Sequence, residues 1–62
     1  MQKIIILDFS TAEVHVFNFD SNVFEDGEDF ISQANDHYGI DLREQDCQWL
    51  ITNDSELNIT FH

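Results

Sequence analysis

Three histidines and a single cysteine are the side chains of this chain that most readily hold metal ions or act as nucleophiles. The intervals between His15, His37, His62 and Cys47 match no zinc-binding pattern. We expect His15 to point outward from a strand, His37 to face solvent on a helix, and His62 to lie at the chain end. Cys47 opens an apolar stretch and is expected to pack as a small hydrophobic residue. The sequence therefore predicts no metal site and no cofactor.

Enzymatic groupings are absent from the sequence as well. No Ser/His/Asp or Cys/His/Asn set occurs in a recognisable context. Carboxylates are plentiful, but acid–base catalysis needs two of them in different environments within one cleft. A domain of 62 residues leaves little room for such a cleft. We predict that the protein is not an enzyme.

Negative charge is the dominant chemical property of the chain. Thirteen acidic residues face two basic ones, which gives a formal net charge of -11. Anionic membranes and nucleic acids should repel such a surface, so neither is an expected direct partner. The expected partners are a basic protein, metal cations, or a second copy that forms a homodimer through a neutral face.

The segment 25–29 (EDGED) concentrates this charge and is the obvious candidate for cation binding. It lacks the ligand spacing of an EF-hand loop. The alternative is the start of a helix, where the helix dipole favours acidic side chains.

Composition predicts one folded α+β domain over residues 1–62. Hydrophobic residues make up 42% of the chain, which is too many for a disordered acidic tail. The apolar stretch at residues 1–7 is too short for a signal peptide or a membrane span, and one cysteine cannot form an intramolecular disulfide. These features predict a cytoplasmic location.

The first twenty residues read as a β-hairpin, with strands over Lys3–Asp8 and Glu13–Asp20. Val14 and Val16 share one parity of the second strand, whereas the two later phenylalanines share the other. This pattern indicates either that both faces are covered or that a β-bulge near Val16 shifts the phase.

A helix is predicted over residues 27–38. Its apolar residues recur at the spacing of one helix face: Phe30, Ile31, Ala34 and Tyr38. Asp26 is the expected N-cap with Asp29 in a capping-box position, and Gly39 can end the helix in the left-handed conformation.

The remaining chain supplies two more predicted strands. After a polar connector that places Ile40 or Leu42 in the core, Cys47–Thr52 reads as a strand in which Trp49 faces the core. A turn at Asn53–Ser55 then leads to an alternating strand over Glu56–His62.

The resulting order is ββαββ, with one helix packed on a four-stranded sheet. A β-grasp-like strand order of 2-1-4-3 and an antiparallel order of 2-1-3-4 both fit. The pattern is similar to ubiquitin-like folds over most of the chain, through Met1-Gln2, Gly39-Ile40 after the helix and Leu50-Ile51. The carboxy-terminal Gly-Gly of conjugated ubiquitin-like proteins is absent, so the resemblance implies no conjugation chemistry.

Two candidate binding surfaces follow from this arrangement. The acidic face lies in the helix and its flanking connections and comprises Asp20, Glu25, Asp26, Glu28, Asp29, Asp36, Asp41, Glu44 and Asp46. The alternative is an apolar open sheet face comprising Ile5, Leu7, Phe17 and Leu50.

The acidic face suggests a protein that imitates a polyanion. DNA carries about one charge per 1.7 Å of axis, and a row of carboxylates can present a comparable series to a basic groove. We therefore expect a non-catalytic inhibitor of a basic DNA- or RNA-binding protein. The alternatives are an adaptor or homodimer that uses the open sheet face, and a cation-binding protein.

Overall fold

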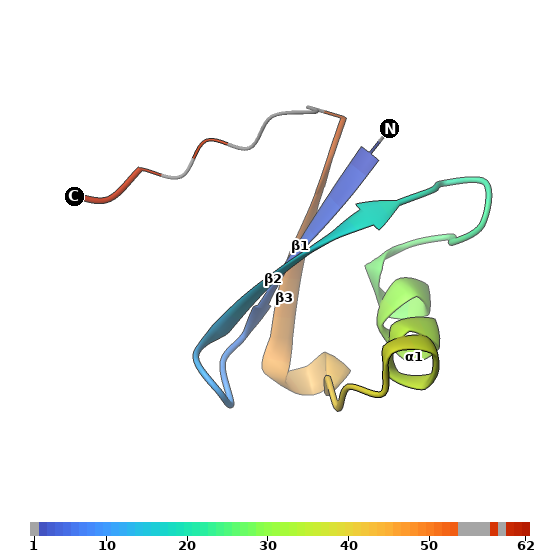
Figure 1. The fold of residues 1–62 in the computed structure, drawn as a ribbon, viewed down its shortest axis with the longest axis horizontal. Helices are drawn as coiled ribbons and strands as arrows, with labels where there is room; N and C mark the ends of the chain where they lie inside the picture. The colour runs from blue at the N-terminus through green and yellow to red at the C-terminus, as the bar shows by residue number, and fades with distance from the viewer. Residues whose placement is uncertain (1, 54–57, 59) are drawn as a thin grey trace.

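The computed structural model describes residues 2–53, 58 and 60–62. Along the chain the elements are β1 (Gln2–Asp8), β2 (Glu13–Phe19), helix α1 (Gly27–Tyr38), the 3-10 turn η1 (Glu44–Asp46) and β3 (Cys47–Thr52). Helix α1 lies on one side of the strands (Figure 1). The elements form a small two-layer α+β arrangement.

The sheet has three antiparallel strands in the order β2-β1-β3. The β1–β2 register runs without interruption from the pair Gln2–Phe19 to the pair Asp8–Glu13. The expected bulge near Val16 is therefore wrong, and so is the alternative of two covered faces, because the helix covers only one. The phenylalanines of β2 face the helix, and its valines face away.

The prediction of a four-stranded sheet is wrong, because β2 and β3 form the two edges of a three-stranded sheet. Of the segment expected to form the fourth strand, Asn58 and Thr60 to His62 are described, and none of them lies in a strand. The rest of that segment lies outside the described residues, as does most of the predicted turn at Asn53–Ser55. Alternating polarity shows that a segment could form a strand, but it does not supply a neighbour to pair with.

The β-grasp order is also wrong. A β-grasp fold places its last strand parallel to the first, whereas β3 lies directly beside β1 and runs antiparallel to it. The likeness to ubiquitin-like folds is therefore confined to the succession of elements. The antiparallel order 2-1-3-4 fails as well, because it also requires the fourth strand.

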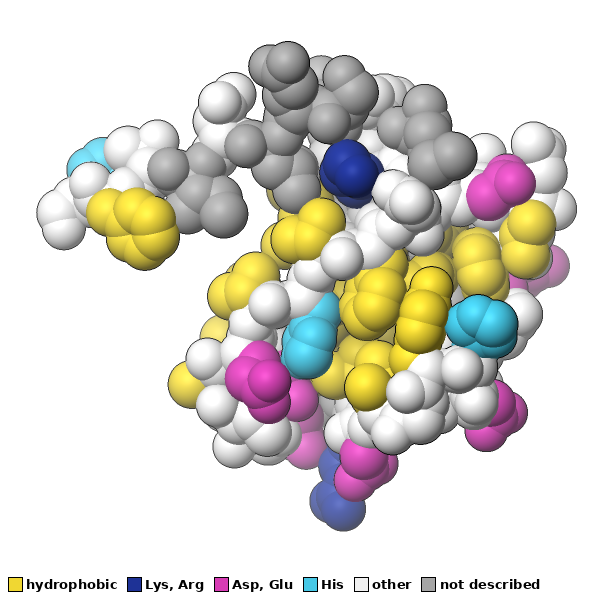
Figure 2. Space-filling model, in the orientation of Figure 1, with side chains coloured by type: hydrophobic (Ala, Val, Ile, Leu, Met, Phe, Trp, Pro, Cys, Tyr) yellow, Lys and Arg dark blue, Asp and Glu magenta, His cyan; other side chains and the backbone are white. Residues whose placement is uncertain are grey.

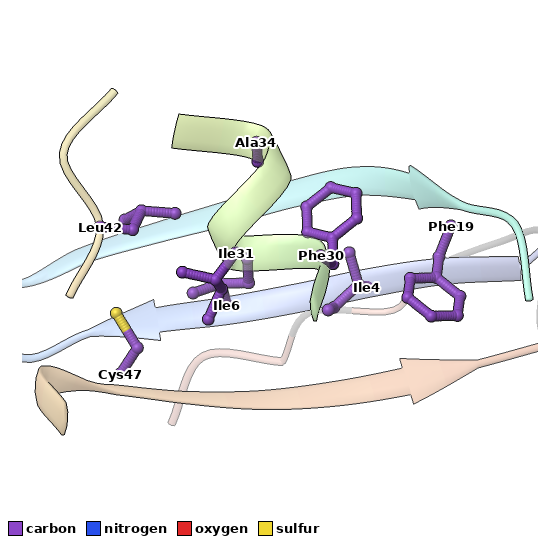
Figure 3. Close-up of a cluster of buried hydrophobic side chains, with 8 residues drawn as sticks. All are labelled: Ile4, Ile6, Phe19, Phe30, Ile31, Ala34, Leu42 and Cys47. Carbon is purple, nitrogen blue, oxygen red and sulfur yellow. The ribbon is translucent and has the colours of Figure 1, made fainter. Parts of the chain in front are cut away.

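The core lies between the sheet and α1. Ile4 and Ile6 of β1 are fully buried there, and their partners across β3 are Ile51 and Trp49. The buried hydrophobic residues come from all three strands, the helix and the connector (Figure 3): Ile4, Ile6, Phe19, Phe30, Ile31, Ala34, Leu42 and Cys47. The predicted core roles of Leu42 and Cys47 are confirmed.

Helix α1 begins at the predicted N-cap Asp26 and ends at the predicted Gly39, but Asp29 does not complete a capping box, because its carboxylate accepts from Glu25 and not from Asp26. The Asp26 carboxylate accepts a hydrogen bond from the Asp29 backbone N–H at 2.9 Å, and Asp29 in turn accepts from the Glu25 N–H at 3.0 Å. At the other end, Gly39 adopts φ 67° and donates its N–H to the Asn35 carbonyl. The left-handed φ carries little steric cost for glycine.

The connector after α1 is held against the helix by one side chain. The Asn35 amide donates to the Leu42 carbonyl at 2.7 Å and accepts from the Leu42 N–H at 2.8 Å. This pair of bonds buries Leu42 and directs the chain into η1 beside the start of the helix.

The start of α1 also meets β3 closely. Gly27 is buried, and a Cβ atom at this position would overlap the indole ring of Trp49. Only glycine lets the helix approach β3 this closely. The contact fixes the helix start, and with it the first acidic residues of the helix.

Candidate functional site

The acidic face defined above is exposed over most of its residues. Only Asp29 and Asp46 are partly buried. Its carboxylates come from the β2–α1 connection, the helix, the connector and η1. Figure 2 shows acidic side chains around the periphery of one view of the molecule. The structure therefore distributes the carboxylates along one helix and its flanks, and does not gather them in a cleft.

Part of this charge has a structural role. Asp26 caps the N-terminus of α1, and Asp29 accepts from the Glu25 backbone N–H and from the Gln33 side-chain amide at 3.1 Å. The hydrogen bonds donated by the Glu25 backbone and by Gln33 lower the pKa of Asp29. These two carboxylates would be present whether or not the protein binds a partner.

A second pair of carboxylates has no such role. Glu28, in the first turn of α1, lies next to Glu44 of η1, and the like charge of Glu44 is the largest cause that raises the pKa of Glu28. Partial desolvation and the charge of Asp26 raise it further. Glu28 and Glu44 therefore lie close enough for their like charges to repel, although they are distant in sequence.

The crowding is not relieved by cations. Within residues 2–53, 58 and 60–62, no Lys or Arg side chain forms an ion pair with an acidic side chain. Lys3 donates to the Asn18 side-chain oxygen at 3.1 Å instead, and Arg43 is exposed. The described carboxylates thus remain uncompensated, which makes a basic partner electrostatically favourable.

The sheet face opposite the helix is apolar. Across it, Ile5 of β1 pairs with Val16 of β2 and Leu50 of β3, and Leu7 pairs with Val14. Leu50 is 64% exposed and Val14 61%. Three of the four residues predicted for this face, Ile5, Leu7 and Leu50, do lie together on it.

The fourth predicted residue, Phe17, lies on the helix side. Its ring contacts Phe30 at a centroid distance of 5.3 Å and Tyr38 at 5.1 Å. His15 shares this face and stacks on Phe17, so its predicted outward orientation is wrong. Strand parity alone could not assign these residues, because both parities of β1 are apolar.

Sequence reasoning missed a cleft between β2 and α1. It measures ≈ 260 Å³ and is lined by Asn18, Phe24, Phe30, Gln33, Ala34, His37 and Tyr38. Figure 2 shows hydrophobic side chains exposed between the sheet and the helix. The sequence shows the aromatic residues of β2 and of the helix, but it does not show how far apart these two elements lie in the fold.

The described part of the chain contains neither a metal-binding group of side chains nor an activated thiol. No group of three or more His, Cys, Asp or Glu side chains there is arranged to hold a metal ion. Burial, followed by the charge of Asp8, raises the pKa of the Cys47 thiol, which disfavours the nucleophilic thiolate. Asp8 itself is tied to the hairpin turn, where Ser10 donates both its hydroxyl and its N–H to the carboxylate and lowers its pKa.

Neither described helix has the length and apolar character that crossing a membrane requires. Comparison with known proteins finds no match among family models, curated proteins or solved structures.

Proposed function

We propose that this chain is a non-catalytic protein-binding domain whose acidic face binds a basic partner. The observation that carries the proposal is the exposed charge beside α1: seven of the nine residues of the acidic face are exposed, and no Lys or Arg of the described residues pairs with them. Glu28 and Glu44 also repel each other there. A cationic side chain placed between them removes this repulsion, and long-range attraction speeds its approach.

In its sharper form, the proposal is that the partner is a nucleic-acid-binding protein and that the domain inhibits it by imitating nucleic-acid charge. Exposed carboxylates along α1, η1 and their connections present a succession of negative charges to the basic groove of such a partner. We place this activity in the cytoplasm, because the only cysteine is a buried, free thiol.

The test begins with the immobilised protein and a cytoplasmic extract. Captured proteins are eluted first with duplex DNA or RNA and then with high salt, and the eluted proteins are identified. Charge mimicry predicts basic proteins that nucleic acid displaces. Partners that only high salt releases would support binding without mimicry.

The affinity of one purified partner is then measured for the wild type and for a variant with four neutralised acids. The four substitutions are Glu28→Gln, Asp36→Asn, Asp41→Asn and Glu44→Gln. These residues make no hydrogen bond that shapes the helix caps, so the fold should persist. The matched control keeps the charge, with Glu28→Asp and Asp36→Glu. Unchanged affinity in the neutralised variant would exclude the acidic face.

The second candidate function is a homodimer that buries the open sheet face. The exposure of Leu7, Val14, Val16 and Leu50 favours it, and no acidic side chain lies among them. Three strands of about seven residues cover roughly 20 Å by 14 Å, which is small against the ~800 Å² that a stable interface buries on each partner. We therefore expect at most a weak dimer.

Sedimentation over a range of concentrations tests this candidate. Leu50→Thr keeps a good strand former in β3 but removes the most exposed part of the open sheet face. A dimer that this substitution dissociates would favour the second candidate. A monomer at every concentration would exclude it.

A further inference from the structure

The free edge of β2 lies next to the aromatic cleft described above. Among the described residues β2 is an edge strand, so half of its backbone groups have no neighbour in that part of the sheet. Which half is free follows from the direction of the hydrogen bonds, since the N–H and C=O of one residue in an antiparallel ladder point to the same side.

One bond at the end of β1 sets this direction. The Phe9 N–H donates to the Asp46 carbonyl at 2.9 Å, in continuation of the pair Asp8–Cys47. The backbone N–H and C=O of Phe9 therefore point toward β3. By alternation, the backbone groups of Asp8, Ile6 and Ile4 point toward β2.

The partners of these residues across β2 are Glu13, His15 and Phe17, whose backbone groups are used within the sheet. The N–H and C=O groups of the intervening residues, Val14 and Val16, point away from it. The free edge thus offers a short row of donors and acceptors that one extended segment can pair with.

The cleft beside this edge is suited to a side chain. Its volume of ≈ 260 Å³ is below the ~300–1,000 Å³ typical of small-molecule sites. Phe24, Phe30 and Tyr38 provide an apolar wall, and Gln33 and His37 provide a polar rim. This combination fits one aromatic or aliphatic side chain that projects from a strand added to β2.

Carboxylates lie at both ends of β2 and on the helix beside the cleft. Glu13 begins β2, and Asp20 directly follows it. Asp29 accepts a hydrogen bond from Gln33, which lines the cleft. An apolar anchor with Lys or Arg on either side would therefore find complementary charge at both ends of the strand and on the helix.

We propose that an extended segment of the partner adds as a strand to the free edge of β2, places one apolar side chain in the cleft between β2 and α1, and brings flanking basic residues to Glu13, Asp20 and Asp29. This inference rests on the proposed function, because it names the segment through which a basic partner is recognised.

The test uses two labelled synthetic peptides of identical composition and charge. Both contain one Phe, one Pro and several Thr and Lys. In the first, a central Phe is flanked by alternating Thr and Lys and the Pro stands at the end, so the peptide can extend. In the second, the same residues are reordered so that the Pro interrupts the centre. Fluorescence anisotropy at low salt measures the affinity of each. We expect the extended peptide to bind about tenfold or more tightly than the interrupted one, since one lost net hydrogen bond of about 1.4 kcal/mol corresponds to tenfold.

Val16→Pro is the decisive variant. It removes an N–H that points away from β1, and edge strands tolerate proline for this reason. The matched control Val16→Thr changes the same side chain but keeps the N–H. Strand addition predicts that Val16→Pro abolishes the preference for the extended peptide and that Val16→Thr keeps it. Tyr38→Ala, which opens one wall of the cleft, should weaken binding of the extended peptide only.

Each other outcome overturns the proposal in its own way. Equal, salt-sensitive binding of both peptides by every variant would leave the acidic face as the binding surface and exclude strand addition. No binding of either peptide at low salt would overturn the proposed function as well. A wild-type dimer that Val16→Pro converts to a monomer would show that a second copy occupies this edge.

Discussion

Replacement of Gly27 by alanine should destabilise the fold, although alanine is the better helix former. Alanine in a helix interior is favoured over glycine by about 0.8–1.0 kcal/mol. At Gly27, however, the new Cβ would overlap the Trp49 ring, so either the ring or the start of the helix must shift. Overpacking of this kind typically costs about 1–3 kcal/mol, so after the gain in helix propensity we expect a net loss of up to about 2 kcal/mol.

This loss is large for so small a domain. At about 0.05–0.15 kcal/mol per residue, a chain of 62 residues has a total stability of roughly 3–9 kcal/mol. For a domain of this size, each 1 kcal/mol shifts the unfolding midpoint by about 4–8 °C. Thermal unfolding followed by circular dichroism should therefore show a midpoint lowered by up to about 15 °C. The fluorescence of Trp49, the only tryptophan, should change in the folded state as its ring is displaced.

A double-mutant cycle isolates the contact. In a Trp49→Val background the ring is gone, so Gly27→Ala should be neutral or stabilising there. An equal loss in both backgrounds would refute the steric explanation, and so would a Gly27→Ala variant more stable than the wild type.

Three further predictions concern the turn, the connector and pH. Ala12 has φ 57°, so Ala12→Gly should stabilise the hairpin by about 0.5–1 kcal/mol in denaturant unfolding, and an unchanged midpoint would contradict this. Asn35→Ala should cost about 1–3 kcal/mol because the Leu42 N–H and C=O lose their partner, whereas Asn35→Asp should recover part of the loss by still accepting from the N–H. The pKa of Glu28 is raised by its carboxylate neighbour, so stability should increase as the pH falls from neutral and Glu28 takes up its proton. The pKa of Asp29 is lowered by hydrogen bonds, so the stability that its carboxylate contributes should be lost at still lower pH. The thermal unfolding midpoint should therefore pass through a maximum above about pH 4, and this maximum should shift in Glu28→Gln.

The elements of the fold were largely predictable because local signals define them. The N-cap Asp26 and the glycine at the C-terminus mark α1 at Gly27–Tyr38, as expected from the sequence. Apolar stretches between turn residues likewise mark β1, β2 and β3. Each of these signals depends on neighbours within a few residues, so one sequence suffices to detect it.

The number of strands was not predictable in the same way. The alternating segment Glu56–His62 satisfies the pattern of a half-buried strand, yet Phe61 is 91% exposed. Whether such a segment pairs depends on the geometry of a distant edge, which no local pattern encodes.

The candidate surfaces show the same limit. All of Ile4 to Leu7 is apolar, so the sequence alone could not decide which parity of β1 faces the helix. This ambiguity placed Phe17 on the wrong face. The crowding of Glu28 and Glu44, and the cleft beside β2, arise from contacts between segments far apart in sequence, and only the tertiary structure reveals them.

The central claim is that the acidic face binds a basic, nucleic-acid-binding partner. The most direct measurement is the affinity of the purified partner for the wild type and for the variant with Glu28, Asp36, Asp41 and Glu44 neutralised, across a range of salt, with duplex nucleic acid as competitor. The claim predicts wild-type binding that weakens steadily with salt, is displaced by nucleic acid, and is strongly reduced in the variant. Binding that ignores salt, resists nucleic acid and survives neutralisation would contradict it.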